Sequence, residues 1–215
     1  MKTTITTFRG TVIVAFALFT SAGILSAQNL VNGSFELGTD PGSDFSSLFA
    51  VDSTTITGWT VSGGTVDYIG GRWAAQDGSR SIDMNGNSAG TLTQNVSGFT
   101  SGQGYRLFFY LAASPDAGAG ASRTLQVNVA TASQDFTALG TGLYSNPGWG
   151  QQHLDFTANS STLALSFVSL ASGDWGPLLD NVSIAPVPEP GILSLGIMTA
   201  GLAGFARWKR VQAVK

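Results

Sequence analysis

The sequence predicts an all-β fold, a β-sandwich of the jelly-roll type, for the middle of this 215-residue chain. Three observations support this prediction. Short apolar–polar alternations recur between Leu30 and Ile184, turn residues separate them, and no window has the period of an amphipathic helix. Eight to ten short strands at this spacing are typical of two sheets that bury their facing sides.

The expected strands follow one another along the chain. Residues 105–111 are apolar on both faces, which indicates a central strand, and residues 125–129 and 163–168 alternate more simply. The other expected strands are residues 56–61, 65–69, 80–84, 91–96, 153–157 and 178–184. Glycine, proline and asparagine pairs such as Gly63-Gly64 and Asn85-Gly86 mark the turns, and residues 115–122 are expected to form a flexible loop.

The first 27 residues have the pattern of a secretory signal peptide. Two basic residues precede a short apolar run at residues 11–19, and small residues follow as far as Ala27. We expect a signal helix that is removed by cleavage after Ala27, with cleavage after Ala22 as the alternative.

The last 30 residues form a tail of three parts: Val-Pro-Glu-Pro at 187–190, an uncharged stretch at 191–206 and a basic end at 207–215. Sixteen residues give about 24 Å of helix, and the flanking residues close most of the gap to a hydrocarbon core of about 30 Å. The tail therefore predicts a transmembrane helix with its basic end in the cytoplasm. A buried core helix is the alternative, disfavoured by the glycine content and the terminal basic cluster.

The predicted sandwich domain, residues 28–185, is acidic. It holds four arginines and twelve acidic residues, a net charge of −8. Such a charge disfavours nucleic acid and anionic lipid as partners and is compatible with divalent cations. The chain has no cysteine, so an exported domain must rely on its core or on a metal for stability, and a lipoprotein anchor is excluded.

The tail resembles the PEP-CTERM sorting signal of Gram-negative bacteria that make exopolysaccharide. Pro188, Glu189 and Pro190 match the motif, followed by the apolar span and the basic stop. The resemblance implies that an exosortase processes the protein. It also implies export through the inner membrane, a membrane-anchored precursor, and a final place at the cell surface or in the extracellular matrix.

The domain resembles carbohydrate-binding modules and other galactose-binding-like jelly rolls. The motif Asn-Gly-Ser-Phe-Glu at residues 32–36 opens it, and Leu-Asp-Asn-Val-Ser at residues 179–183 closes it. The stretch from Gly58-Trp59 to Asn85-Gly86 looks like the choice-of-anchor C family of bacterial surface proteins, which also resembles the DUF642 domain of plant cell-wall proteins. The resemblance implies that the first and last strands lie close together.

The same resemblance implies a structural calcium ion between Glu36 and Asp180. Calcium takes six to eight oxygen ligands, and backbone carbonyls near Ser34 and Asn181 could add to the two carboxylates. The alternative is that Glu36 caps a turn and Asp180 accepts hydrogen bonds from backbone amides.

Aromatic side chains suggest a glycan ligand, since sugar C–H faces stack on aromatic rings. Trp59 lies in an apolar segment and is expected in the core. Trp73, in a loop between Arg72 and Asp77, is the expected exposed candidate, followed by Tyr144 and Trp149. Structural packing is the competing explanation for each of them.

The sequence favours a non-catalytic protein. Its single histidine, His153, lies in an expected strand, and the sequence has no histidine cluster for zinc. A pair of carboxylates for glycoside cleavage stays an open alternative, because the two residues of such a pair need to be close in the fold and not in the sequence. We expect an exported surface or matrix protein that binds extracellular polysaccharide. The alternative is a structural or protein-adhesive surface module without sugar affinity.

Overall fold

A computed structural model describes residues 28–188 of the chain. The predicted signal peptide, residues 1–27, and the tail from Glu189 onward, with its apolar span, lie outside the described residues. Among residues 28–188, no helix has the length and apolar character needed to cross a membrane.

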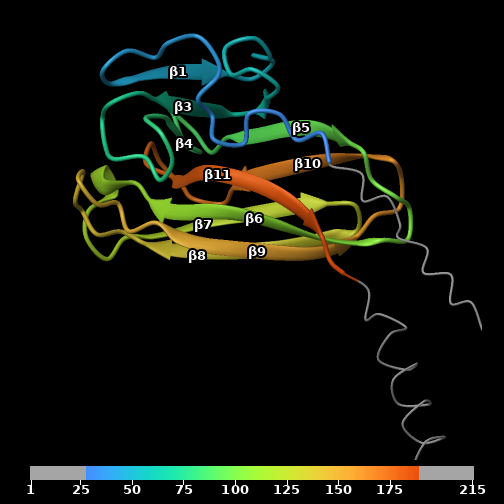
Figure 1. The fold of residues 1–215 in the computed structure, drawn as a ribbon. Coiled ribbons are helices and arrows are strands. Elements are labelled where there is room, and N and C mark those ends of the chain that lie inside the picture. The colour runs from blue at the N-terminus through green and yellow to red at the C-terminus, as the bar shows by residue number, and fades with distance from the viewer. Residues whose placement is uncertain (1–27, 189–215) are drawn as a thin grey trace, which may run out of the picture.

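The described residues form a sandwich of two antiparallel sheets, so the predicted all-β fold is confirmed (Figure 1). The strands are β1 (Phe45–Phe49), β2 (Thr60–Gly63), β3 (Thr65–Ile69), β4 (Ser81–Asp83), β5 (Thr91–Ser97), β6 (Gly104–Ala113), β7 (Ser122–Val129), β8 (Ala132–Leu139), β9 (Gly150–Thr157), β10 (Thr162–Ser169) and β11 (Pro177–Pro186). The six-stranded sheet has the order β1-β3-β4-β11-β6-β9, and the five-stranded sheet has the order β2-β5-β10-β7-β8.

Alternating side chains of both sheets meet in one core, as period-2 strands require. Phe109 of β6 lies at its centre, with ring centroids 5.1 Å from Phe136 of β8 and 5.6 Å from Phe167 of β10. Trp59 packs against Phe35 and Phe167 at 5.3 and 6.0 Å and is 1% exposed. The expectation that Trp59 belongs to the core is therefore confirmed.

Three local expectations were wrong. The strand expected at residues 56–61 begins only at Thr60, because Gly58 has a φ of +84° and the amide of Trp59 closes a turn onto the Ile56 carbonyl at 3.0 Å. The edge strands β1 and β8 were not expected, and β8 buries a single side chain, that of Phe136. The loop expected at residues 115–122 begins with a short 3-10 helix, η1 (Pro115–Ala117).

The opening and closing segments of the domain lie side by side. The amide of Val182 in β11 donates to the carbonyl of Gly33 at 2.8 Å. The first strand itself is elsewhere, since β3 and β4 separate β1 from β11 in the sheet (Figure 1). The contact expected between the two terminal motifs is thus present, but residues 32–36 make it without forming a strand.

Candidate functional site

A pocket of about 200 Å³ opens on the outer face of the six-stranded sheet, over β1, β3 and β4. Its lining residues are Phe45, Ser47, Asp67, Ile69, Arg72, Trp73, Asp83, Gly86, Asn87, Asp116, Asp174 and Trp175. Strand register brings together the lining residues that come from β1, β3 and β4. Phe45 pairs with Ile69, and Ser47 and Asp83 both pair with Asp67. Directly paired residues point to the same face of a sheet.

Two carboxyl groups, those of Asp67 and Asp83, stand opposite each other in this pocket. Asp83 is buried, and its Oδ1 accepts the amides of Asn85 and Gly176, both at 2.9 Å. Burial raises the pKa of Asp83 to about 8, and these hydrogen bonds only partly oppose it. Burial also raises the pKa of Asp67, against a hydrogen bond of 2.6 Å from the Ser47 hydroxyl. The pocket therefore holds two carboxyl groups that resist ionisation.

Two aromatic side chains give the pocket partly exposed walls. Phe45 is 38% exposed and Trp175 is 48% exposed. Neither was expected from the sequence, because Phe45 stands in a segment without clear alternation and Trp175 in a short Gly/Asp-rich loop. The one sequence feature that could have pointed to this site was a tryptophan, Trp175, that stands between Asp174 and Gly176 and outside any apolar run.

The guanidinium of Arg72 is held at the pocket edge by two carboxylates. Its Nη1 donates to Asp44 Oδ1 at 2.9 Å, and its Nε donates to Asp116 Oδ2 at 2.8 Å. It also lies over the rings of Phe45 and Tyr144, at 5.3 and 6.0 Å from their centroids. Burial would raise the pKa of Asp116, but hydrogen bonds from Arg72 and Tyr144 lower it overall. The positive charge of Arg72 is thus balanced within the protein.

The expectation that Trp73 is exposed was wrong. Its side chain is 6% exposed and packs in a small apolar cluster with Ile69, Ala112 and Leu178, on the outer face of the sheet. Its indole N–H donates to the Ser81 hydroxyl at 3.3 Å. Trp73 therefore forms part of the pocket floor and not an open stacking platform.

The other two aromatic candidates lie next to the segment that carries Trp73. The amide of Ala74 donates to the carbonyl of Tyr144 at 2.8 Å, and the indole N–H of Trp149 donates to the carbonyl of Ala74 at 3.0 Å. Tyr144 is 47% exposed, whereas Trp149 is partly buried against the cluster that contains Trp73. The structure brings the three together, but only Trp73 lines the pocket.

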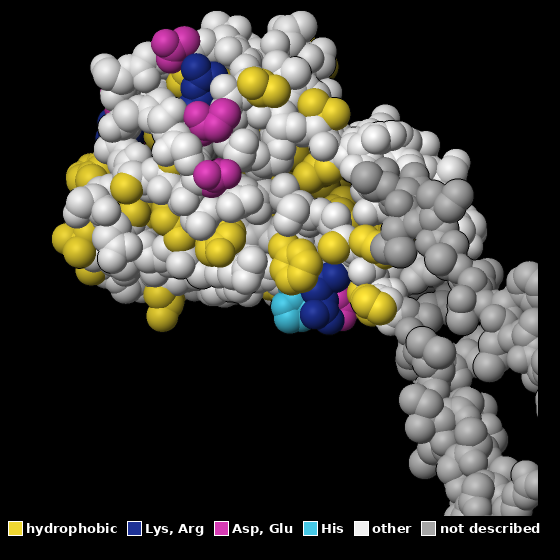
Figure 2. Space-filling model, in the orientation of Figure 1, with side chains coloured by type: hydrophobic (Ala, Val, Ile, Leu, Met, Phe, Trp, Pro, Cys, Tyr) yellow, Lys and Arg dark blue, Asp and Glu magenta, His cyan; other side chains and the backbone are white. Residues whose placement is uncertain are grey.

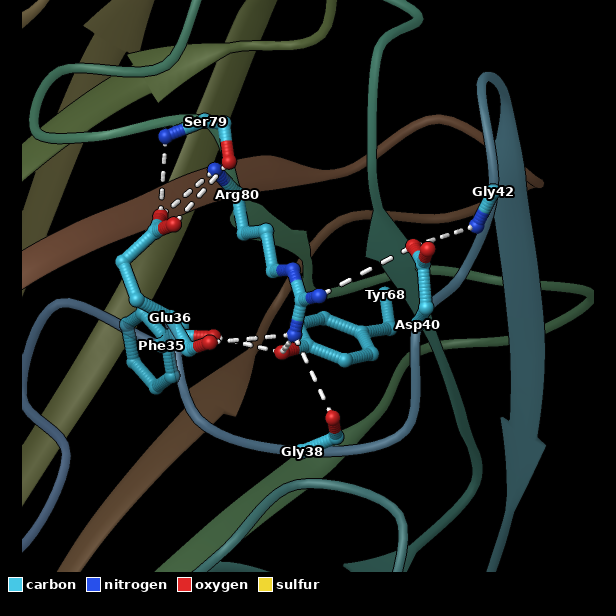
Figure 3. A network of polar contacts seen from close by, with 8 residues as sticks. All are labelled: Phe35, Glu36, Gly38, Asp40, Gly42, Tyr68, Ser79 and Arg80. Carbon is cyan, nitrogen blue, oxygen red and sulfur yellow. Dashed lines mark hydrogen bonds and ion pairs between the residues drawn. The ribbon is translucent and has the colours of Figure 1, made fainter.

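The carboxylate of Glu36 holds the loop that leads into β4 (Figure 3). Oε1 accepts the amides of Ser79 and Arg80 at 2.9 and 2.7 Å, and Oε2 accepts the Ser79 hydroxyl at 2.9 Å. Arg80 reaches back, because its Nη1 donates to the Glu36 carbonyl at 3.0 Å and to the Tyr68 hydroxyl at 2.9 Å. Tyr68 in turn donates to the carbonyl of Phe35 at 2.5 Å. Glu36 thus joins the N-terminal segment to β3 and β4.

Asp180 of β11 holds the same loop from the other side. Its Oδ2 accepts the amides of Gln76 and Asp77 at 2.8 and 3.1 Å, and its Oδ1 accepts the amide of Asn181 at 2.7 Å. Burial raises the pKa of Asp180 to about 7, and the three amides partly oppose that effect. We call residues 76–80, with these two carboxylates, the carboxylate-anchored loop.

The geometry bears on the calcium predicted between Glu36 and Asp180. Each of their four carboxylate oxygens already accepts at least one N–H or O–H donor, so an ion there would compete with the donors of the loop for these oxygens. Within residues 28–188 no group of three or more Asp, Glu or His side chains is placed to hold a metal ion. Calcium at this position stays a prediction.

Figure 2 shows the charged side chains on one face of the domain in two groups, one in the upper part of the view and one at the lower edge. In the β6–β9 pair, Arg106 and Asp155 form a bidentate ion pair with Nε–Oδ1 at 2.5 Å. The Asp155 side chain is exposed and that of Arg106 is partly exposed, so solvent screens this pair and it adds little stability.

A family model described as DUF642, protein of unknown function, matches residues 28–185. The chain is also 38% identical over 195 residues to halomucin of Haloquadratum walsbyi, which covers 83% of this chain. The chain spans about 2% of the length of that curated relative.

Several solved carbohydrate-binding modules are similar to this chain at low identity. TmCBM61, solved with β-1,4-galactotriose, is 17% identical, with 75% of this chain and 100% of that chain covered and a TM-score of 0.45. A xylan-binding domain from Paenibacillus barcinonensis is 18% identical, with coverages of 71% and 99% and a TM-score of 0.45. A family 35 module from Clostridium thermocellum is 19% identical, with coverages of 66% and 99% and a TM-score of 0.40. The ligands in these names are those of the named proteins.

The buried carboxyl groups predict that the domain is more stable at mildly acidic pH than at mildly basic pH. Asp83 and Asp180 have pKa values of about 8 and about 7 in the folded state, above the ordinary aspartate value of 3.8. The folded state therefore binds more protons than the unfolded state, and stability falls as the pH rises from about 4 to about 8. We expect a higher Tm at about pH 5 than at about pH 8 in thermal melts followed by circular dichroism.

The variant Asp83→Asn keeps an acceptor at Oδ1 but cannot ionise, so its Tm should fall less over this pH range. The matched control is Asp135→Asn, at an exposed carboxylate on the five-stranded sheet, which should keep the wild-type fall. An equally steep fall in Asp83→Asn and wild type would contradict the assignment of this pH dependence to Asp83.

Proposed function

The chain belongs to the DUF642 family, and from that premise we propose that its sandwich domain is a non-catalytic module that binds a glycan in the pocket beside Trp175. The pocket supports this proposal because it combines the two kinds of group that sugars need. Trp175 and Phe45 offer apolar rings, and Asp67, Asp83 and Asn87 offer polar groups for hydroxyls. This combination is the observation that carries the proposal.

The size of the pocket limits what can enter it. About 200 Å³ is below the roughly 300–1,000 Å³ of pockets for drug-sized ligands. A single sugar unit, at a chain end or on a side branch, is the ligand we expect to fill it. The rest of a polysaccharide would extend over the neighbouring surface.

The scaffold around the pocket supports binding without large rearrangement. Asp67 and Asp83 lie on paired strands, and Arg72 is fixed between Asp44 and Asp116. Groups held in place in the free protein lose little conformational freedom when a ligand binds.

A protein-adhesive role without sugar affinity is the second candidate. The edge strand β1 supports it, because Phe49 is 61% exposed and the nearby Val51 is 87% exposed. An exposed apolar edge can pair with another chain. These side chains do not line the pocket, so the two roles can be tested separately.

The proposal includes export and sorting. Residues 1–27 would direct the chain through the inner membrane, and residues 191–206 would hold the precursor there until an exosortase acts at Pro188–Pro190. The processed domain would then join the cell surface or the extracellular polysaccharide, its proposed partner. The ordered motif, apolar span and basic end in the tail support this part of the proposal.

Glycan binding should depend on Trp175. We expect Trp175→Ala to weaken binding to exopolysaccharide-derived oligosaccharides about fivefold, since a stacked ring contributes on the order of 1 kcal/mol. Titration calorimetry measures the affinity. The matched control is Phe49→Ala, at a more exposed aromatic outside the pocket, which should bind as wild type does.

Equal affinity of Trp175→Ala and wild type would argue against the pocket as the site. Loss of adhesion to cells in Phe49→Ala alone would favour the protein-adhesive role. Release of new reducing ends from the oligosaccharide would contradict a non-catalytic module.

Sorting should leave a trace in the mass of the exported protein. Mass spectrometry of outer cellular fractions should find polypeptides that lack the apolar and basic parts of the tail. Finding only chains that still end at Lys215 would rule out processing by exosortase.

The calcium prediction is tested by chelation. A structural ion between Glu36 and Asp180 would stabilise the folded state by an amount that grows with the free calcium concentration relative to the Kd, so EDTA should lower the Tm and added calcium should restore it. An unchanged Tm would reject calcium and leave the hydrogen bonds of the carboxylate-anchored loop as the connection between these residues.

A further inference from the structure

The pocket is strongly acidic for its size. Four of its lining residues are aspartates, at positions 67, 83, 116 and 174, and its one basic lining residue is Arg72. The Nε and Nη1 atoms of Arg72 already donate to Asp116 and Asp44. An anionic ligand would therefore meet carboxylates and find a guanidinium that is already paired. Like charges brought together in this way disfavour binding.

A buried acceptor beside Asp83 lacks a donor. The atom Asn85 Oδ1 is fully buried and makes no hydrogen bond within the described chain. The Ser114 hydroxyl, which carries its own donor, hydrogen-bonds to Asp83 and so opposes the rise in the pKa of Asp83. A Cβ at Gly176 would lie 2.6 Å from Asn85 Oδ1 and 2.7 Å from Asp83 Oδ1, so these oxygens crowd around one point. Buried polar atoms without partners indicate a missing donor.

Resting on the proposed glycan-binding function, we propose that the pocket selects an amino sugar, whose free ammonium group lies among Asp67, Asp83 and Asp174, and that it rejects uronic-acid glycans. An ammonium group has three donors and no acceptor, which matches the carboxyl oxygens that line this pocket and the unpaired Asn85 Oδ1 beside Asp83. It also supplies a cationic partner for the carboxyl groups of Asp67 and Asp83, which stand opposite each other on β3 and β4.

A metal ion fits these residues less well than an ammonium group. Divalent cations need several oxygens converging at about 2.0–2.6 Å, and residues 28–188 contain no set of three or more carboxylate or imidazole side chains placed for that. Ammonium needs only hydrogen-bond distances of about 2.7–2.9 Å to carboxylates. The aromatic wall adds to the preference, since the ring face of Trp175 attracts cations.

The electrostatics of the free pocket agree with this assignment. Burial raises the pKa of both Asp67 and Asp83, and the nearby carboxylate of Asp174 raises that of Asp67 further. With a pKa of about 8, Asp83 is largely protonated at about pH 6. An ammonium group favours the ionised carboxylate, so Asp83 should give up its proton to the buffer when the amino sugar binds.

The test compares two oligosaccharides of equal length on the full domain at about pH 6, where the sugar amine is protonated. One is a β-1,4-linked glucosamine oligomer and the other is its N-acetylated form. Titration calorimetry in two buffers of different ionisation enthalpy should show the glucosamine oligomer binding about tenfold tighter, with release of about one proton. The preference should persist in EDTA.

Two variants assign the effect to the pocket. Asp67→Asn and Asp174→Asn should each remove most of the preference, and Asp174 is exposed, so its variant should fold if the first one does not. Asp135→Asn, which removes an exposed carboxylate on the other sheet, should keep it.

The outcomes separate this inference from the function on which it rests. Equal binding of both oligosaccharides, tighter binding of an oligogalacturonate, binding that needs calcium, or binding of glucosamine without proton release would each overturn the amino-sugar proposal while leaving a glycan-binding domain. Binding of none of these sugars would overturn both.

Discussion

The carboxylate-anchored loop is the constraint on which the rest of the site depends. Glu36 comes from the segment that opens the domain and Asp180 from the strand that closes it, and both accept backbone amides of residues 76–80. Charge-assisted hydrogen bonds of this kind are stronger than neutral ones. The two carboxylates therefore fix a loop across the outer face of a sheet in a domain that has no disulfide.

The pocket follows from that fixed loop and from strand register. The loop begins just after Arg72 and Trp73, so its anchoring holds these two residues over β1, β3 and β4. Register then places Asp67 directly opposite Asp83 on the same face. Placing two carboxyl groups opposite each other in a partly buried site costs stability, either as repulsion when both are ionised or as the raised pKa values seen for Asp67 and Asp83. A site that keeps both carboxyl groups is more easily explained by a ligand than by stability.

The sequence was sufficient for the fold because alternation and turn residues are local signals. Residues 105–111 and 163–168 bury alternate side chains as expected, and the terminal motifs meet at Gly33 and Val182. The edge strands β1 and β8 were missed because a strand with little burial has little pattern.

The site was harder to predict because it depends on contacts between distant segments. Trp73 has a polar neighbourhood in the sequence but is covered by Ala112 and Leu178, which lie far along the chain. The pairing of Asp67 with Asp83 requires the register of β3 and β4, which no local pattern gives.

The most direct test of the glycan pocket uses the indole N–H signals of Trp59, Trp73, Trp149 and Trp175 in nitrogen-15 NMR spectra during titration with an oligosaccharide. We predict that the signal of Trp175 shifts most and that of Trp59, buried between the sheets, stays in place. Saturable shifts of other tryptophans with Trp175 unmoved would contradict the proposed site.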